Sequence, residues 1–302
     1  MMKIALSTDF LRSTGSPERA LRSIAQAGFT HLHWCHQWCT DFLYGKHEIR
    51  AYARMLRENG LKLLDIHGSA GREKNWFSLE EYERRAGVEL VENRLEMLSE
   101  LEGEGVLMMH APYIGKDFTP EQREAAGLRL DSLRRSLDEL MPHLEKLGLL
   151  IALENMPGDT FEYIRTLLEE YPESRLGITY DSGHGNIAEG MGMDFLAPLR
   201  GRLQALHLHD NDGSGDQHRA PFTGTVDWER MVRMIVDSSY VNRPASFELS
   251  MRGSPYFEPE LENEQKEETV RAYLSDAYTR CARIAEMLES ARRQHARDRE
   301  TI

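Results

Sequence analysis

The chain has 302 residues, 40% of them apolar, and a formal net charge of −13, from 37 Lys and Arg against 50 Asp and Glu. This acidic balance repels a nucleic-acid backbone at long range, so we expect no nucleic-acid partner. No apolar run reaches about 18 residues and no charged-then-apolar leader is present, which predicts a cytoplasmic protein without a membrane span. Three cysteines, an odd number, argue against a disulfide framework.

Short apolar runs alternate along the chain with longer amphipathic stretches. The apolar runs predict eight strands, at residues 4–7, 31–36, 61–66, 106–109, 149–153, 176–180, 203–208 and 245–247. The stretches between them predict helices at about 17–27, 47–58, 79–101, 120–147, 160–170 and 194–199, another from 227, and a last one over 265–293.

Eight strands that alternate with eight helices predict parallel strands joined by right-handed crossovers. The natural closure is a single (β/α)8 TIM barrel, an α/β fold that takes about 250 residues plus insertions. No linker divides the chain, so we expect one domain over residues 1–302, with a C-terminal helical extension from about 265.

Ligand-type side chains stand where six of the predicted strands end. They are His67, His110, Glu154, Asp181, His207 and Glu248. In a TIM barrel the C-terminal ends of the strands form the active-site face, so these side chains are expected to converge there. Carboxylate oxygens together with imidazole nitrogens suit Mn²⁺, Zn²⁺, Co²⁺ or Mg²⁺. Four of these side chains come from consecutive strands and could surround one cation.

The stretch 207–218, which reads HLHDNDGSGDQH, gathers three acids and three histidines within twelve residues. These groups would repel one another if buried, unless a cation lay among them. A solvated acidic turn is the alternative, and Asp216 and His218 could then simply brace the loop. Similarly, His67 or His110 alone could be a hydrogen-bonded core histidine. His184 could contact substrate, support a ligand or bind another ion.

With these motifs, the chain resembles the xylose isomerase-like TIM barrel superfamily, in particular its sugar phosphate isomerases and epimerases. The motifs are ALEN at 152–155, TYDSGH at 179–184, HLHDNDGSGDQH at 207–218, GTVDW at 224–228 and FELS at 247–250. Residue by residue, the resemblance implies a metal site of Glu154, Asp181, His207 and Glu248. It places the substrate-contacting histidine of the ketose 3-epimerases on His184. His209 matches no ligand position and is interpreted as a strand-face residue, although a slip of register would exchange it with His207.

The same superfamily contains endonuclease IV, a trinuclear zinc phosphodiesterase. Its ligand positions also look occupied here, which makes five residues candidates for additional metal ions: His67, His110, His184, Asp216 and His218. The acidic balance and the lack of clear basic DNA-gripping loops argue against a DNA substrate. The motifs leave the number of ions, between one and three, open.

The leading hypothesis is a divalent-metal-dependent isomerase or epimerase that acts through an enediolate on a small keto sugar or derivative. The cation would hold a carbonyl and a neighbouring hydroxyl oxygen, and Glu154 and Glu248 would form the base and acid pair. His184, His110 and His67 are the candidate substrate-binding residues, and one ion per chain is favoured. The alternatives are a multinuclear zinc phosphoesterase and a non-catalytic, metal-dependent carbohydrate binder. Helix faces of barrels often pair, so the sequence is compatible with a homo-oligomer.

Overall fold

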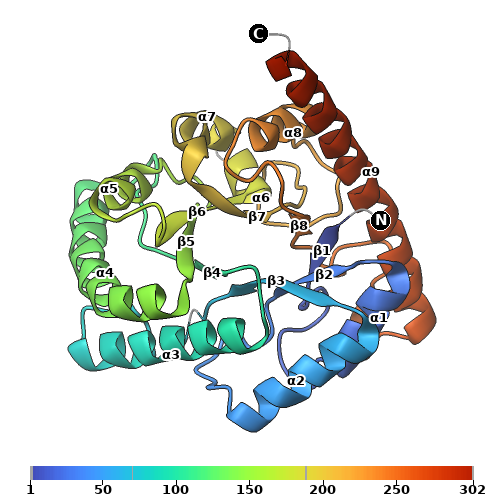
Figure 1. Ribbon diagram of the computed structural model, residues 1–302, viewed down its shortest axis with the longest axis horizontal. Coiled ribbons are helices and arrows are strands. Elements are labelled where there is room, and N and C mark those ends of the chain that lie inside the picture. Colours follow the sequence, from blue (N-terminus) through green and yellow to red (C-terminus); the bar gives the residue numbers. More distant parts are fainter. Residues whose placement is uncertain (1–2, 70, 188, 301–302) are drawn as a thin grey trace.

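The computed structural model describes residues 3–69, 71–187 and 189–300. Within them, eight parallel strands surround a common axis and the helices form an outer layer (Figure 1). The strands are β1 (Ile4–Ser7), β2 (His31–Trp34), β3 (Lys62–His67), β4 (Val106–Met109), β5 (Leu150–Glu154), β6 (Leu176–Asp181), β7 (Leu203–His207) and β8 (Ala245–Phe247). The predicted TIM barrel is therefore confirmed.

The longer helices cover the outside of the sheet. They are α1 (Glu18–Ala27), α2 (Lys46–Asn59), α3 (Glu81–Glu100), α4 (Pro120–Leu147), α5 (Glu162–Glu170), α8 (Trp228–Val236) and α9 (Glu267–Glu300). Two short helices, α6 (Ser182–Asn186) and α7 (Gly192–Leu196), follow β6. Short 3-10 turns occupy Ala197–Arg202 and Pro259–Leu261. None of the helices in the described ranges is long and apolar enough to cross a membrane.

Local sequence signals explain where several helices begin and end. The Thr119 hydroxyl accepts a hydrogen bond from the Gln122 amide, and the Gln122 side chain returns one to Thr119, so α4 starts with a capping box. Gly28 ends α1 with a φ of 104°, a conformation that glycine adopts without steric cost. Several bounds differ from the sequence prediction, and β2, for example, ends at Trp34 instead of residue 36. α6 was not expected, α9 starts at Glu267, and α9 continues to Glu300 instead of ending near residue 293.

The barrel is closed between β7 and β8 by a single bridge. The other neighbouring strands form regular parallel ladders, in the order β7-β6-β5-β4-β3-β2-β1-β8. At the closure, the Leu208 amide donates to the Ser246 carbonyl at 3.0 Å and the Glu248 amide donates to the Leu208 carbonyl at 3.2 Å. This closure brings the ends of β7 and β8 together, and with them His207 and Glu248.

A layer of small residues lies beneath the polar strand ends. Ala152 and Ala205 form an apolar cluster with Val106 that is separate from the main core between sheet and helices. They stand two residues before Glu154 and His207, so they face the same side of the sheet as those residues. The strands thus carry small side chains at one level of the barrel and titratable ones at the next.

Candidate metal and active site

Four strand-end side chains converge in the barrel, as the sequence analysis expected. Glu154, Asp181 and His207 are the last residues of β5, β6 and β7, and Glu248 directly follows β8. Asp181 and His207 are paired across the β6–β7 ladder, which sets them side by side. All four are buried, and each offers one ligand atom within 4.8 Å of the others. We refer to these four residues as the strand-end quartet.

His207 lies at the centre of the quartet. Its Nδ1 atom is 2.6 Å from Oε1 of Glu154 and 2.8 Å from Oε2 of Glu248. The second oxygen of Glu154, Oε2, lies 2.9 Å from Nε2 of His110. Asp181 accepts a hydrogen bond from the backbone amide of His184 at 2.6 Å. The carboxylates are therefore fixed in orientation by groups that belong to neighbouring strands.

Pairing of opposite charges sets the direction in which the pKa of each of these groups is shifted. Burial alone would raise the pKa of Glu154 and Glu248, but the adjacent His207 outweighs it and the pKa of both carboxyls lies well below the usual range. Burial alone would lower the pKa of His207, yet Glu248 and Glu154 hold it well above its usual range. Two carboxylates thus share one positive charge. A divalent cation placed among the same oxygens would satisfy them in the same way.

A second group lies next to the quartet and shares Glu154 with it. His67, at the end of β3, and His110, just after β4, offer ligand atoms within 4.8 Å of each other and of Glu154. His67 Nδ1 contacts the Gly68 carbonyl oxygen at 2.7 Å, and its ring lies 4.6 Å from the ring of Trp38. Burial, with His110 beside it, lowers the pKa of His67 well below its usual range, so its ring is neutral at neutral pH. A neutral imidazole has a lone pair to offer to a metal ion.

A third group centres on Asp216, in the loop after β7. Asp216 Oδ2 lies 3.2 Å from Nε2 of His184 and 3.0 Å from Nε2 of His218. The rings of His218 and His209 stack with centroids 4.2 Å apart. His218 has a φ of 46°, which is uncommon for a residue other than glycine. Asp216 and His218 therefore contact site histidines and do more than brace the loop.

The neighbouring acids of this loop have a different role. The Asp210 carboxylate is buried and accepts hydrogen bonds from the Val226 amide and from the Trp228 indole, both at 3.1 Å. Asp212 accepts from the Ser214 amide at 3.1 Å and from the Arg219 guanidinium at 3.0 Å. These two acids hold the loop in shape, and only Asp212 is exposed as the solvated-turn interpretation expects, since Asp210 is buried.

His209, interpreted from the sequence as a strand-face residue, contacts the quartet in the structure. His209 is fully buried, and its Nε2 lies 2.9 Å from Oδ1 of Asp181. Residues 207 and 209 face the same side of their strand because side chains alternate along it, and this period could have identified both. No sequence motif singled out His33 and Asp65, which form a buried hydrogen-bonded pair in the barrel at 2.7 Å.

The donor set fits a divalent cation. Nε2 of His207 and Nδ1 of His209 are buried and have no hydrogen-bond partner among the described residues. Buried polar atoms are almost always paired, so unpaired ones in a cluster of carboxylates mark a place for a further group. The mixed oxygen and nitrogen ligands suit Mn²⁺, Zn²⁺, Co²⁺ or Mg²⁺.

Comparison with known proteins agrees with this architecture. The family model described as xylose isomerase-like TIM barrel matches residues 21–276. The uncharacterized protein y4fM of Sinorhizobium fredii is 28% identical over 295 residues, which cover 90% of each chain. The uncharacterized protein MJ1311 of Methanocaldococcus jannaschii is 29% identical over 175 residues, 55% of this chain and 58% of that one.

Solved structures with the same architecture include proteins named as epimerases. A D-tagatose 3-epimerase-like protein superimposes with a TM-score of 0.70 at 19% identity, covering 98% of this chain and 100% of that one. The 3-keto-D-glucoside 4-epimerase YcjR of E. coli gives a TM-score of 0.62 at 19% identity, covering 91% and 100%. At such identities the likeness shows a shared fold.

Proposed function

Because the chain belongs to the xylose isomerase-like TIM barrel family, we propose that it is a divalent-metal-dependent sugar isomerase or epimerase. Its substrate in this proposal is a small keto sugar or derivative. The observation that carries the proposal is the strand-end quartet, in which two glutamates from opposite sides meet at His207. The names of the structural neighbours, epimerases of ketoses and of a keto-glucoside, support the substrate class.

The proposed ligands of the cation are Glu154, Asp181, His207 and Glu248, with one ion per chain. Mn²⁺, Zn²⁺, Co²⁺ and Mg²⁺ all accept such a donor set. When bound, the cation supplies Lewis acidity that polarises a carbonyl oxygen and makes the neighbouring C–H bond more acidic. The burial of the quartet keeps water out and so strengthens each charge interaction within it.

Glu154 and Glu248 are the proposed proton-transfer pair. Their low pKa keeps both carboxyls ionised at neutral pH, so either can accept a proton from carbon. The same low pKa makes each a weak base, which restricts the reaction to C–H bonds next to a carbonyl. Since the two carboxylates approach His207 from β5 and from the end of β8, one can remove a proton and the other can return one.

Three histidines are proposed to bind the substrate. His110 has a side chain that is 22% exposed, so it can meet a ligand that enters from solvent, while His67 lies beside it with its ring centroid 4.9 Å away. His184 borders a small hollow that is also lined by Asn155, Met156 and Phe161. This hollow adjoins the quartet, because the Asn155 side chain donates to the Asp181 carbonyl and accepts from the Asp181 amide.

Substitution of the glutamates tests the proposal. The metal-loaded protein is incubated with a panel of ketoses and keto-glycosides, and products are followed by NMR. Glu154→Gln and Glu248→Gln should each abolish turnover while the fold, followed by circular dichroism, remains intact. Full activity in either variant would remove that residue from the proton-transfer pair.

A multinuclear zinc phosphoesterase is the second candidate, because two more ligand groups flank the quartet. One is His67, His110 and Glu154, and the other is His209, Asp216 and His218. Asp216→Ala and His218→Ala separate the candidates. Both should abolish a trinuclear phosphoesterase, measured on small phosphodiesters, whereas an isomerase should keep its single ion and most of its turnover.

A further inference from the structure

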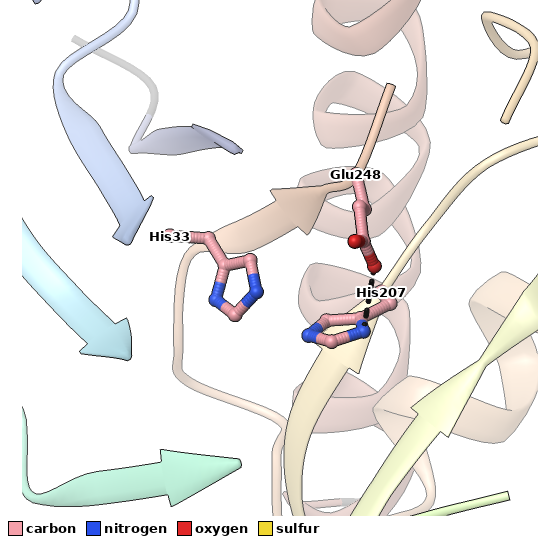
Figure 2. A group of neighbouring side chains, drawn as sticks. All are labelled: His33, His207 and Glu248. Atoms are coloured by element: carbon pink, nitrogen blue, oxygen red, sulfur yellow. Dashed lines mark ion pairs between the residues drawn. The ribbon is translucent and has the colours of Figure 1, made fainter. Parts of the chain in front are cut away.

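Next to the strand-end quartet lies His33, a histidine to which the proposed mechanism gives no role. His33, on β2, is fully buried and its ring centroid lies 4.3 Å from that of His207. Figure 2 shows the His33 ring turned toward His207 and Glu248, which come from β7 and from the end of β8. The three residues each offer a ligand atom within 4.8 Å of the other two.

Asp65 fixes the orientation of His33. The two residues are paired across the β2–β3 ladder, and Nδ1 of His33 lies 2.7 Å from Oδ1 of Asp65. A carboxylate at Nδ1 holds the proton there and leaves the lone pair of the ring on Nε2. Histidines that bind metal ions almost always have their other ring nitrogen held in this way by a carboxylate or carbonyl.

The remaining nitrogen of each ring lacks a partner. Nε2 of His33 and Nε2 of His207 are both buried and unpaired among the described residues, as are the hydroxyls of Ser7 and Ser246 on the adjoining β1 and β8. His207 already uses Nδ1 to contact Glu154 and Glu248. Two imidazole nitrogens and a carboxylate thus lie together in the buried interior, and neither nitrogen is paired with a protein group among the described residues, an arrangement that suits a cation.

We propose that His33, oriented by Asp65, is a metal ligand, and that His33, His207 and Glu248 form a second position for the cation. The inference rests on the proposed function, since it shares His207 and Glu248 with the strand-end quartet. Because both positions use His207, they are alternatives for one ion.

The two positions differ in the ions they prefer. The position at His33 has two nitrogen ligands and one carboxylate, which favours Zn²⁺ and Co²⁺. The strand-end quartet has three carboxylates and one imidazole, which also suits Mn²⁺ and Mg²⁺. The balance between the positions therefore depends on the ion that is supplied, and His33 acts as a determinant of metal selectivity.

The test measures ion binding to metal-stripped protein, by chelator competition, first with Zn²⁺ and then with Mn²⁺. His33→Gln and Asp65→Asn should each weaken Zn²⁺ binding by about 10-fold to 100-fold and leave Mn²⁺ binding unchanged. Loss of a residue that orients a metal ligand typically has an effect of this size. His31→Gln is the matched control, because His31 is on the same strand but pairs with Thr30 outside the cluster. Retained Mn²⁺ binding also shows that each variant is folded.

Two outcomes would overturn the inference. One is an unchanged ratio of Zn²⁺ to Mn²⁺ affinity in both variants. The other is a crystal structure of the Zn²⁺-loaded protein in which His33 touches no ion. Asp181→Asn distinguishes failure of this inference from failure of the proposed function, because Asp181 belongs only to the strand-end quartet. If Asp181→Asn leaves Mn²⁺ binding unchanged, the proposed metal site itself is wrong.

Discussion

Nδ1 of His207 lies 2.6 Å from Oε1 of Glu154, although 53 residues separate the two in the chain. The parallel order of β5, β6 and β7 creates this contact, because it brings the C-terminal ends of all three strands to one face of the barrel. The positive charge that Glu154 shares with Glu248 resides on His207. A divalent ion bound among the same oxygens would replace that charge.

Loss of one strand-end carboxylate should reduce metal retention. Asp181→Asn removes a negative charge from the quartet while keeping the size of the side chain, so we expect metal content after dialysis to fall to a small fraction of the wild-type value. Asp212→Asn is the control, because Asp212 is an exposed acid that holds the loop shape. Equal metal content in the two variants would show that Asp181 is not a ligand.

His207 and His209 should behave differently when replaced. His207 belongs to the quartet, whereas His209 contacts Asp181 and stacks on His218. We expect His207→Asn to lose the ion. His209→Asn should keep the ion with an affinity lowered by about 10-fold, because an orienting partner of Asp181 is missing. The reverse pattern in metal titrations would assign the ligand role to His209, the register that the sequence motif left open.

Gly183 should tolerate no side chain. A Cβ atom at this position would lie 1.9 Å from Cε1 of His209, whose ring fills the space beside the glycine. Gly183→Ala must displace that ring, and we expect both weaker metal binding and a loss of about 1–3 kcal/mol in unfolding free energy from overpacking. Gly201→Ala provides the comparison, since a Cβ there meets nothing within 4 Å. Thermal unfolding and metal titration of both variants check this prediction.

Stability should depend on pH through Asp159, which lies outside the quartet. Burial raises the pKa of this carboxyl to about 7, and the opposing hydrogen bond from the Phe161 amide only partly offsets it. An unfolded Asp titrates near pH 4, so between about pH 4 and 7 the folded protein binds more protons than the unfolded chain. The unfolding free energy therefore falls as pH rises through this window, with a contribution of up to about 1.4 kcal/mol per pH unit.

Asp159→Asn should remove this contribution. The difference in unfolding free energy between wild type and variant, measured by urea denaturation, should shift steadily against the wild type from about pH 4 to 7 and then level off. A difference that stays constant over this range would mean that Asp159 titrates normally in the folded protein.

Much of the fold follows from the sequence, because most strands are short, largely apolar runs and polar residues end them or follow them closely. β4, α4 and β8 have the predicted bounds. The short helix α6 was not predicted, since Ser182, Gly183 and Gly185 are poor helix formers and carry no apolar period. Asp181 caps it by accepting from the His184 amide, so one residue ends β6 and starts α6.

The candidate site could also be predicted only in part from the sequence. Glu154, Asp181, His207 and Glu248 could be identified because each stands at a strand end, where the topology alone brings them together. His33 and Asp65 lie within their strands, and a polar residue inside a strand gives no indication of which side chains it meets across the barrel. Only the β2–β3 register and the closure of the barrel bring His33 to His207.

Solvent deuterium exchange tests the central claim most directly. The protein, loaded with Mn²⁺ or Co²⁺, is incubated in D₂O with a ketose panel, and deuterium at the carbon next to the carbonyl is measured by NMR and mass spectrometry. We expect incorporation that requires the metal and is lost in Glu154→Gln and Glu248→Gln. Sugar-dependent thermal stabilisation without any deuterium incorporation would contradict an isomerase or epimerase and indicate a protein that binds sugar without turning it over.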